Sequence, residues 1–232
     1  MNDYKKGLKA GIPIGLGYLS VSFSFGIMAI GASLSWWQAL IISMLTLTSA
    51  GQLAGIGIMP YPGRYLEMLI AQSTINIRYS FMSISLSQKT DSKFKGIFKW
   101  LFGFFVTDEI FAVAISQEKV SRSYFGGLVT LPYFGWAIGT LIGAVVGNIL
   151  PEIIMSALCL AMYGMFIAVL VPKAKEDKKV IIAILIAIIF GVLLYYVPIL
   201  KQVPQGIAIS ISAVVAALIC AFVFPKEVIK DE

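Results

Sequence analysis

Eight apolar stretches follow one another along the 232 residues of the chain, separated by short polar or basic connections. A transmembrane helix needs about 20 predominantly apolar residues, and each stretch comes close to or exceeds that length. The pattern therefore predicts an all-α polytopic membrane protein with one transmembrane domain, 1–232. The stretches are 12–33, 36–58, 65–87, 97–117, 124–149, 152–171, 179–198 and 204–224.

Lysines gather in the connections, and their positions bear on how many stretches cross the membrane. Loops on the cytoplasmic side carry an excess of Lys and Arg. With eight plain crossings and a cytoplasmic N-terminus, the connection 89–99 would lie outside, against this rule. The clusters are Lys5, Lys6 and Lys9; Lys89, Lys93, Lys95 and Lys99; Lys173, Lys175, Lys178 and Lys179; and Lys226 and Lys230.

An internal repeat provides an arrangement that satisfies the charge rule. Aligning residue n with residue n + 113 pairs Gly26 with Gly139. The same alignment superimposes the boundaries of the apolar stretches in the two halves. If the second stretch of each half is broken or re-entrant, each half crosses three times and the halves become inverted repeats. We therefore expect inverted repeats, 1–117 and 118–232, with six full crossings and two broken or re-entrant segments. Eight plain transmembrane helices are the alternative.

The second stretch, 36–58, contains the more polar of the two predicted breaks. Unwound backbone at membrane depth is tolerated only where it is buried in protein or lines a wet cavity. A continuous helix, with Ser and Thr hydroxyls bonded to carbonyls one turn earlier, is the alternative. The small and polar residues are Ser43, Thr46, Thr48, Ser49, Gly51 and Gln52.

Three charged residues interrupt the apolar stretches near their middles: Arg78 in the third, Asp108 and Glu109 in the fourth. A charge at this depth costs about 2.5–3.5 kcal/mol on insertion scales, so it is rarely without a function. With a helical rise of 1.5 Å per residue, Arg78 and Asp108 both lie roughly 21–24 Å from the connecting loop. We expect an arginine–carboxylate contact across this hairpin.

These charges predict a substrate site inside the membrane domain. Arg78 would hold a carboxylate, and Asp108 or Glu109 would hold an ammonium group or a proton. Repulsion between neighbouring carboxylates favours proton uptake by one of them, which predicts proton coupling. A static ion pair that sets helix register is the alternative. The candidate substrate-binding residues are Gly51, Gln52, Asn76, Arg78, Asp108 and Glu109.

Glycines recur at every fourth position along the fifth stretch and therefore share one helix face. Small residues in this pattern allow another helix to approach closely. They predict tight packing, either with the first stretch of the same chain or with a separate subunit. The glycines are Gly135, Gly139, Gly143 and Gly147.

Composition excludes several classes of protein. Hydrophobic residues make up 59% of the chain and the mean hydropathy is +0.89, which excludes a soluble domain in practice. Histidine is absent, Cys159 and Cys220 lie in apolar stretches, and no P-loop motif occurs. The net charge of +6 comes mainly from lysines in the connections. We expect no enzymatic activity, no cofactor or metal, and no nucleic-acid partner.

Three motifs together resemble the AzlC family of branched-chain amino acid exporters. They are Ser49-Ala50-Gly51-Gln52-Leu53, Asn76-Ile77-Arg78 with the following Tyr79-Ser80-Phe81, and Thr107-Asp108-Glu109-Ile110-Phe111-Ala112. Gly11-Ile12-Pro13 agrees as well, whereas Leu53 replaces an aromatic residue that family members usually carry.

The resemblance implies export of leucine, isoleucine, valine or close analogues across the bacterial cytoplasmic membrane. It also implies a small hydrophobic partner subunit of the AzlD type. Together with the lysine clusters, it leads us to expect cytoplasmic N- and C-termini. A channel for a small solute, or a structural or accessory membrane subunit, are the alternative functions.

Overall fold

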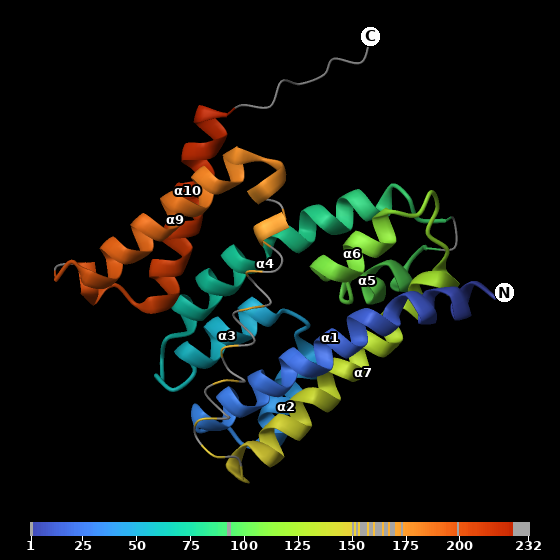
Figure 1. The fold of residues 1–232 in the computed structure, drawn as a ribbon, viewed down its shortest axis with the longest axis horizontal. Helices are drawn as coiled ribbons and strands as arrows, with labels where there is room; N and C mark the ends of the chain where they lie inside the picture. The colour runs from blue at the N-terminus through green and yellow to red at the C-terminus, as the bar shows by residue number, and fades with distance from the viewer. Residues whose placement is uncertain are drawn as a thin grey trace. The chain divides into compact units, whose positions relative to one another are not determined.

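Helices form the regular structure of the protein in its computed structural model, which describes residues 2–91, 94–149, 174–198 and 200–224 and isolated positions within 151–172. Two 3-10 turns, Gly147–Ile149 and Leu200–Gln202, accompany the helices (Figure 1). The α-helices are α1 (Asp3–Gly31), α2 (Trp36–Leu45), α3 (Ser49–Ile58), α4 (Tyr65–Ser87), α5 (Ile97–Gly103), α6 (Asp108–Ile115), α7 (Arg122–Val146), α9 (Lys178–Tyr196) and α10 (Gln205–Val223).

Within these described ranges, α1, α7, α9 and α10 are long and apolar enough to cross a membrane. The predicted all-α membrane fold is therefore confirmed. Most of the sixth apolar stretch, 152–171, lies outside the described residues, as do Lys93, Lys173, Lys226 and Lys230.

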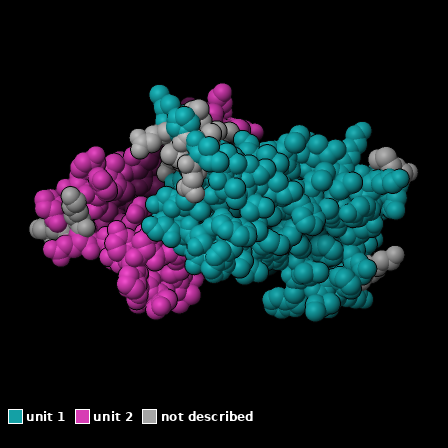
Figure 2. Space-filling view, turned by 90° about the horizontal axis from the view of Figure 1, so that it is seen from below, with its two compact units in different colours: residues 1–56, 76–163 teal, residues 57–75, 164–232 magenta. Residues whose placement is uncertain are grey.

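The chain divides into two compact units, which Figure 2 colours separately. Unit 1 comprises Met1–Ile56 and Asn76–Tyr163, and unit 2 comprises Gly57–Ile75 and Gly164–Glu232. The charged residues predicted for the site all belong to unit 1.

In unit 2, the start of α10 is capped by a buried side chain from α4. The Glu67 carboxylate, only 4% exposed, accepts a 2.9 Å hydrogen bond from the Gly206 backbone N–H. A carboxylate at a helix N-terminus satisfies a free N–H group and suits the helix dipole. A Cβ atom at position 206 would crowd Ile58 and Glu67, so glycine fits this cap.

In unit 1, the predicted glycine face of α7 packs against α1, so the neighbour is the first stretch of the same chain. Glycines from both helices bring the two backbones together, because a side chain at any of these positions would overlap the facing helix. Gly135, Gly139 and Gly143 face the backbone of Gly15, Leu19 and Phe23; Gly7, Gly11 and Gly26 face that of Tyr124, Leu128 and Thr140.

These contacts show that α1 and α7 run parallel, since Gly7 faces Tyr124 near their starts and Phe23 faces Gly143 near their ends. Inverted repeats related by n + 113 would make the same two helices antiparallel. The predicted inversion between 1–117 and 118–232 is thus not confirmed, and the parallel packing argues against it.

The second stretch is broken, as predicted, and the break lies at 46–48, just before Gly51. Thr46 has an extended backbone (φ −139°, ψ 96°), and α3 begins at Ser49. Ile56 of α3 packs with Ala39 of α2 and Ala29 of α1. The chain therefore returns to the end of unit 1 at which it entered, and we call α2–α3 the first hairpin.

The fourth stretch is also broken, although the sequence analysis treats 97–117 as one crossing segment. Helix α5 ends at Gly103, and α6 begins at Asp108 after the N-cap Thr107. Glycine is a poor helix former, whereas a Thr cap followed by acidic residues favours a new helix start. These local signals explain why the stretch is not one continuous helix.

This second hairpin, α5–α6, enters and leaves unit 1 at the end where α1 begins. The Lys89 amine donates to the carbonyl oxygens of Ile115 (2.7 Å), the last residue of α6, and of Gln117 (3.2 Å), just beyond it. At the start of α5, the Phe98 ring lies 3.9 Å from the Arg122 guanidinium carbon. The fourth stretch therefore turns back inside unit 1 and leaves at the end where it entered, which is the geometry of a re-entrant segment.

Lysines of several segments meet at this end of unit 1, which we call the basic end. The Ser121 hydroxyl donates to Asp3 at 2.9 Å, and the Asp91 N–H donates to the Val120 carbonyl at 3.0 Å. These bonds bring the N-terminus, the connection after α4 and the start of α7 together. Of the four lysine clusters that were expected on one side of the membrane, the N-terminal cluster and the described lysines of the connection 89–99 thus lie at the same end.

The two hairpins enter unit 1 from opposite ends, and each follows a long helix. The first follows α1, and the second follows α4, whose residues 76–87 run toward the basic end, antiparallel to α1. An inverted relation of helix plus hairpin therefore exists inside the first half of the chain, between segments that the repeat analysis did not align.

Gly143→Ala tests the α1–α7 packing. The new methyl group would overlap the Phe23 carbonyl, so the free energy of unfolding should fall by about 1–3 kcal/mol, as overpacking typically costs. Gly17→Ala is the matched control, because Gly17 of α1 faces open space and alanine favours helix. Thermal unfolding in detergent measures both variants, and equal melting temperatures would contradict the close packing.

Candidate functional site

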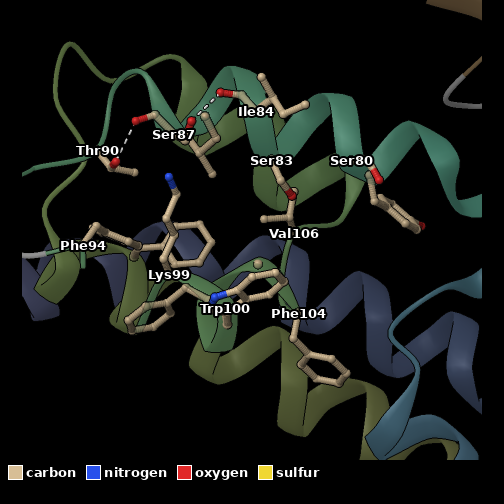
Figure 3. Close-up of a pocket in the computed structure, with 15 residues that line it drawn as sticks. Ser80, Ser83, Ile84, Ser87, Thr90, Phe94, Lys99, Trp100, Phe104 and Val106 are labelled. Atoms are coloured by element: carbon tan, nitrogen blue, oxygen red, sulfur yellow. Dashed lines mark hydrogen bonds between the residues drawn. The ribbon is translucent and has the colours of Figure 1, made fainter. Parts of the chain in front are cut away.

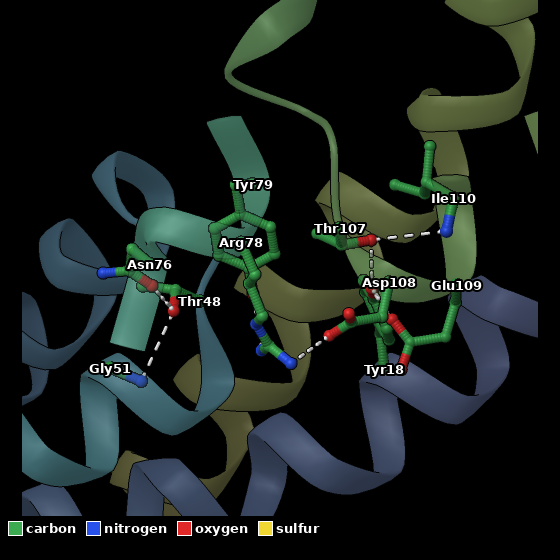
Figure 4. A network of polar contacts seen from close by, with 10 residues as sticks. All are labelled: Tyr18, Thr48, Gly51, Asn76, Arg78, Tyr79, Thr107, Asp108, Glu109 and Ile110. Carbon is green, nitrogen blue, oxygen red and sulfur yellow. Dashed lines mark hydrogen bonds and ion pairs between the residues drawn. The ribbon is translucent and has the colours of Figure 1, made fainter. Parts of the chain in front are cut away.

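An ion pair joins α4 to the tip of the second hairpin, as predicted for the hairpin contact. The Arg78 Nη1 atom lies 2.9 Å from Asp108 Oδ2 (Figure 4). Asp108 is the first residue of α6, so the hairpin break places its side chain at the middle of the stretch. Arg78 keeps 39% of its side chain exposed and Asp108 keeps 21%, so the pair is not sealed.

Arg78 has hydrogen-bonding capacity beyond this ion pair. Its Nη2 atom donates to the Tyr79 hydroxyl at 3.1 Å, and the guanidinium carbon lies 4.9 Å from the centre of the Tyr79 ring. The buried Nε atom has no partner among the described residues. A guanidinium carries five N–H donors, so Asp108 and Tyr79 leave part of it available to another acceptor.

Glu109 does not share Arg78 with Asp108 but bonds to Tyr18 of α1. The Tyr18 hydroxyl, in a side chain only 5% exposed, lies 2.6 Å from both Glu109 Oε2 and Thr107 Oγ1. A hydroxyl has one proton and can also accept. Tyr18 can therefore donate a hydrogen bond to an ionised Glu109, or accept a hydrogen bond from a neutral Glu109 and donate one to Thr107.

The tip of the first hairpin reaches the same part of α4. The Thr48 hydroxyl lies 2.5 Å from Asn76 Oδ1 and also accepts the Gly51 N–H at 3.3 Å. Asn76 and Arg78 are two residues apart, so one short segment of α4 contacts both hairpin tips (Figure 4). The structure thus brings Gly51, Asn76, Arg78 and the acidic pair into one polar network.

Gln52 lies next to this network and stabilises the backbone of the break at 46–48 between α2 and α3. Its side chain is only 3% exposed, its amide nitrogen donates to the Thr46 carbonyl at 2.8 Å, and its oxygen accepts from Trp136 at 3.1 Å. The Trp136 ring meets Tyr18 edge-on, 5.2 Å between centroids. A role in supporting the tip follows from these bonds, whereas substrate contact by Gln52 stays a prediction.

The sequence did not predict which side chains form hydrogen bonds with the site residues. These partners are Tyr18, Thr48, Tyr79 and Trp136. Tyr18 and Glu109 are 91 positions apart, so no local pattern connects them. Thr107 carried a signal, since a threonine followed by acidic residues is a typical helix start.

Both half-helices begin at the network, because α3 starts at Ser49 and α6 at Asp108. The partial positive charge of a helix N-terminus stabilises nearby carboxylates, here Asp108 and Glu109. Broken helices that start at a polar centre are a feature of membrane proteins that bind small solutes or ions. The fold and the site thus define an all-α membrane protein with a charged centre between two broken segments.

The chain belongs to the AzlC family, because residues 13–150 match the family model described as AzlC protein. It is 30% identical over 174 residues to an uncharacterized membrane protein of Archaeoglobus fulgidus, covering 74% of this chain and 76% of the relative. It is 22% identical over 205 residues to the inner membrane protein YgaZ of Escherichia coli, covering 84% of each. No solved structure matches the chain.

Proposed function

We propose that this protein is a secondary transporter that exports branched-chain amino acids in exchange for protons, working with a small membrane partner subunit. The observation that carries the proposal is the partly exposed Arg78–Asp108 ion pair, which joins α4 to the tip of the second hairpin. An α-amino acid presents a carboxylate and an ammonium group at fixed spacing. Arg78 and the acidic pair offer the complementary charges, and the surrounding apolar side chains suit an aliphatic substituent.

In the proposed cycle, the substrate carboxylate takes the place of Asp108 on Arg78. Charge-assisted bonds to a guanidinium are strong, so the exchange replaces one carboxylate by another of similar affinity. The released Asp108 then binds the substrate ammonium group or takes up a proton. Because the ion pair links α4 to the second hairpin, its opening frees that hairpin tip to move.

Glu109 supplies a second proton site that does not compete for Arg78. Its hydrogen bond to Tyr18 can reverse direction with protonation, so proton uptake changes the bond network without breaking it.

The basic end faces the cytoplasm in this proposal, in line with the positive-inside rule. The N-terminal lysines and those of the connection 89–99 then lie on the cytoplasmic side. The C-terminal segment, beyond residue 224, is expected on the same side from its lysines.

Arg78→Ala tests the substrate role directly. Hydrogen bonds to charged groups contribute about 1.5–3 kcal/mol, so leucine efflux should fall by roughly ten- to a hundredfold. Arg78→Lys keeps the charge but not the forked geometry and should retain intermediate activity. Efflux of labelled leucine from vesicles with equal amounts of inserted protein measures this. Wild-type efflux by the alanine variant would refute the role of Arg78.

Asp108→Asn and Glu109→Gln test the proton coupling. Each variant removes one carboxylate at nearly constant shape, so the residue that carries the proton should lose the dependence of efflux on the pH gradient. Leucine counterflow, which needs no net proton movement, should persist in that variant. Glu118→Gln, at an exposed acid beyond α6, is the control. Unchanged pH dependence in both site variants would show that neither carboxylate carries the coupled proton.

The partner subunit is tested by leucine efflux from cells that produce this chain alone, a small AzlD-type protein alone, both proteins, or neither. We expect efflux to be greatest with both proteins and to be absent without this chain. Efflux by the small protein alone would make this chain an accessory subunit.

A further inference from the structure

A cavity of about 620 Å³ lies in unit 1 between the last turns of α4 and the second hairpin (Figure 3). Protein pockets that bind small molecules usually measure about 300–1,000 Å³, so the cavity is large enough for an amino acid. None of the residues predicted for the substrate site lines this cavity.

One wall of the cavity is a row of hydroxyl groups along α4 and its C-terminal turn: Ser80, Ser83, Ser87 and Thr90. Their spacing of three and four residues places them on one helix face. Ser87 and Thr90 bond to backbone carbonyls, at 2.7 and 2.8 Å. The hydroxyls of Ser80 and Ser83 have no partner among the described residues, so they are available to a ligand.

The opposite wall is apolar and mostly aromatic. Figure 3 shows Phe94, Trp100 and Phe104 across the cavity from the serines. Phe102, Phe125 and Val106 complete this wall. We call the whole cavity the serine–aromatic groove.

The groove extends from the basic end to Tyr79, the neighbour of Arg78. At one end lies Tyr79, whose hydroxyl accepts from Arg78. At the other end lie Thr90 and Lys99, and the Lys99 ammonium has no ion-pair partner in the described part of the chain.

We infer that the serine–aromatic groove binds the transported amino acid on its way from the cytoplasm to Arg78; this rests on the proposed export function. Lys99 attracts the substrate carboxylate at the entrance. The free serine hydroxyls donate to the carboxylate and accept from the ammonium group. The aromatic wall takes the aliphatic side chain, and full burial of a Leu or Val side chain contributes about 1.5–3 kcal/mol.

The two-sided chemistry of the groove favours a zwitterion over a lipid chain. The two hydroxyls without partners, those of Ser80 and Ser83, would be costly against hydrocarbon, whereas an amino acid offers both acceptors and donors. The residues that line the groove therefore favour one class of substrate, a neutral α-amino acid with an apolar side chain.

Ser83→Cys, in a chain whose Cys159 and Cys220 are replaced by serine, tests the inference. Ser85→Cys is the matched control, because Ser85 is on the same helix but does not line the groove. A charged, membrane-impermeant methanethiosulfonate reagent, applied from the cytoplasmic side, should modify the cysteine at 83 much faster than that at 85. Leucine at ten times its dissociation constant should slow modification roughly tenfold, because about a tenth of the sites stay free.

Lysine or glutamate at the same concentration should not protect the cysteine at 83. Absent modification, or modification that leucine does not slow while the protein exports leucine, would overturn the groove as a binding site. Absent leucine efflux by the unmodified chain with its partner would instead overturn the proposed function, so the two failures are distinguishable.

Gly103→Leu provides a second test that does not depend on cysteine chemistry. Gly103 lines the groove, and a Cβ atom there would meet no atom within 4 Å, so the variant should fold. The leucine side chain should fill the groove and lower efflux. Gly17→Leu is the control, because Gly17 of α1 faces open space and does not line the groove, and it should leave efflux nearly unchanged. Equal efflux by both variants would contradict the inference.

Discussion

The charge of Arg78 is the constraint around which unit 1 is organised. A guanidinium within an apolar domain needs partners, and a single carboxylate on a neighbouring element is the least demanding solution. Asp108 reaches it at 2.9 Å because α6 starts midway along its stretch and not at the end. The broken hairpin and the ion pair thus require each other. Two residues earlier, Asn76 holds the other hairpin, so α4 ties both tips to one position.

The parallel pair of α1 and α7 is the rigid frame against which the hairpins are held. Glycines on both helices allow backbone contact along most of their length, and close backbone contact leaves little room for sliding. Tyr18 projects from α1 to Glu109 of the second hairpin, and Trp136 projects from α7 to Gln52 of the first. The two rings touch, so the supports of both hairpins meet inside the frame.

The similarity between the halves of the chain reflects packing more than inversion. The alignment at n + 113 matches Gly26 with Gly139, and both belong to the faces through which α1 and α7 contact each other. Two parallel helices that pack through small residues share a spacing without being related by an inverted duplication. The inverted relation that does exist, between α1 with the first hairpin and α4 with the second, has no comparable glycine signal.

Sequence patterns were enough to predict the helical membrane fold and the glycine face of α7, and they indicated a break in the second stretch and three charges near the middle of their stretches. Each depends on composition or on spacing within one segment. The folded structure was needed to show that the fourth stretch turns back, that Asp108 and not Glu109 pairs with Arg78, and that Glu109 bonds to Tyr18. Asp108 and Glu109 are adjacent carboxylates that the sequence does not distinguish. Their partners differ because α6 directs the Asp108 side chain toward α4 and the Glu109 side chain toward α1. That direction depends on contacts between residues up to 91 positions apart, which no local pattern records.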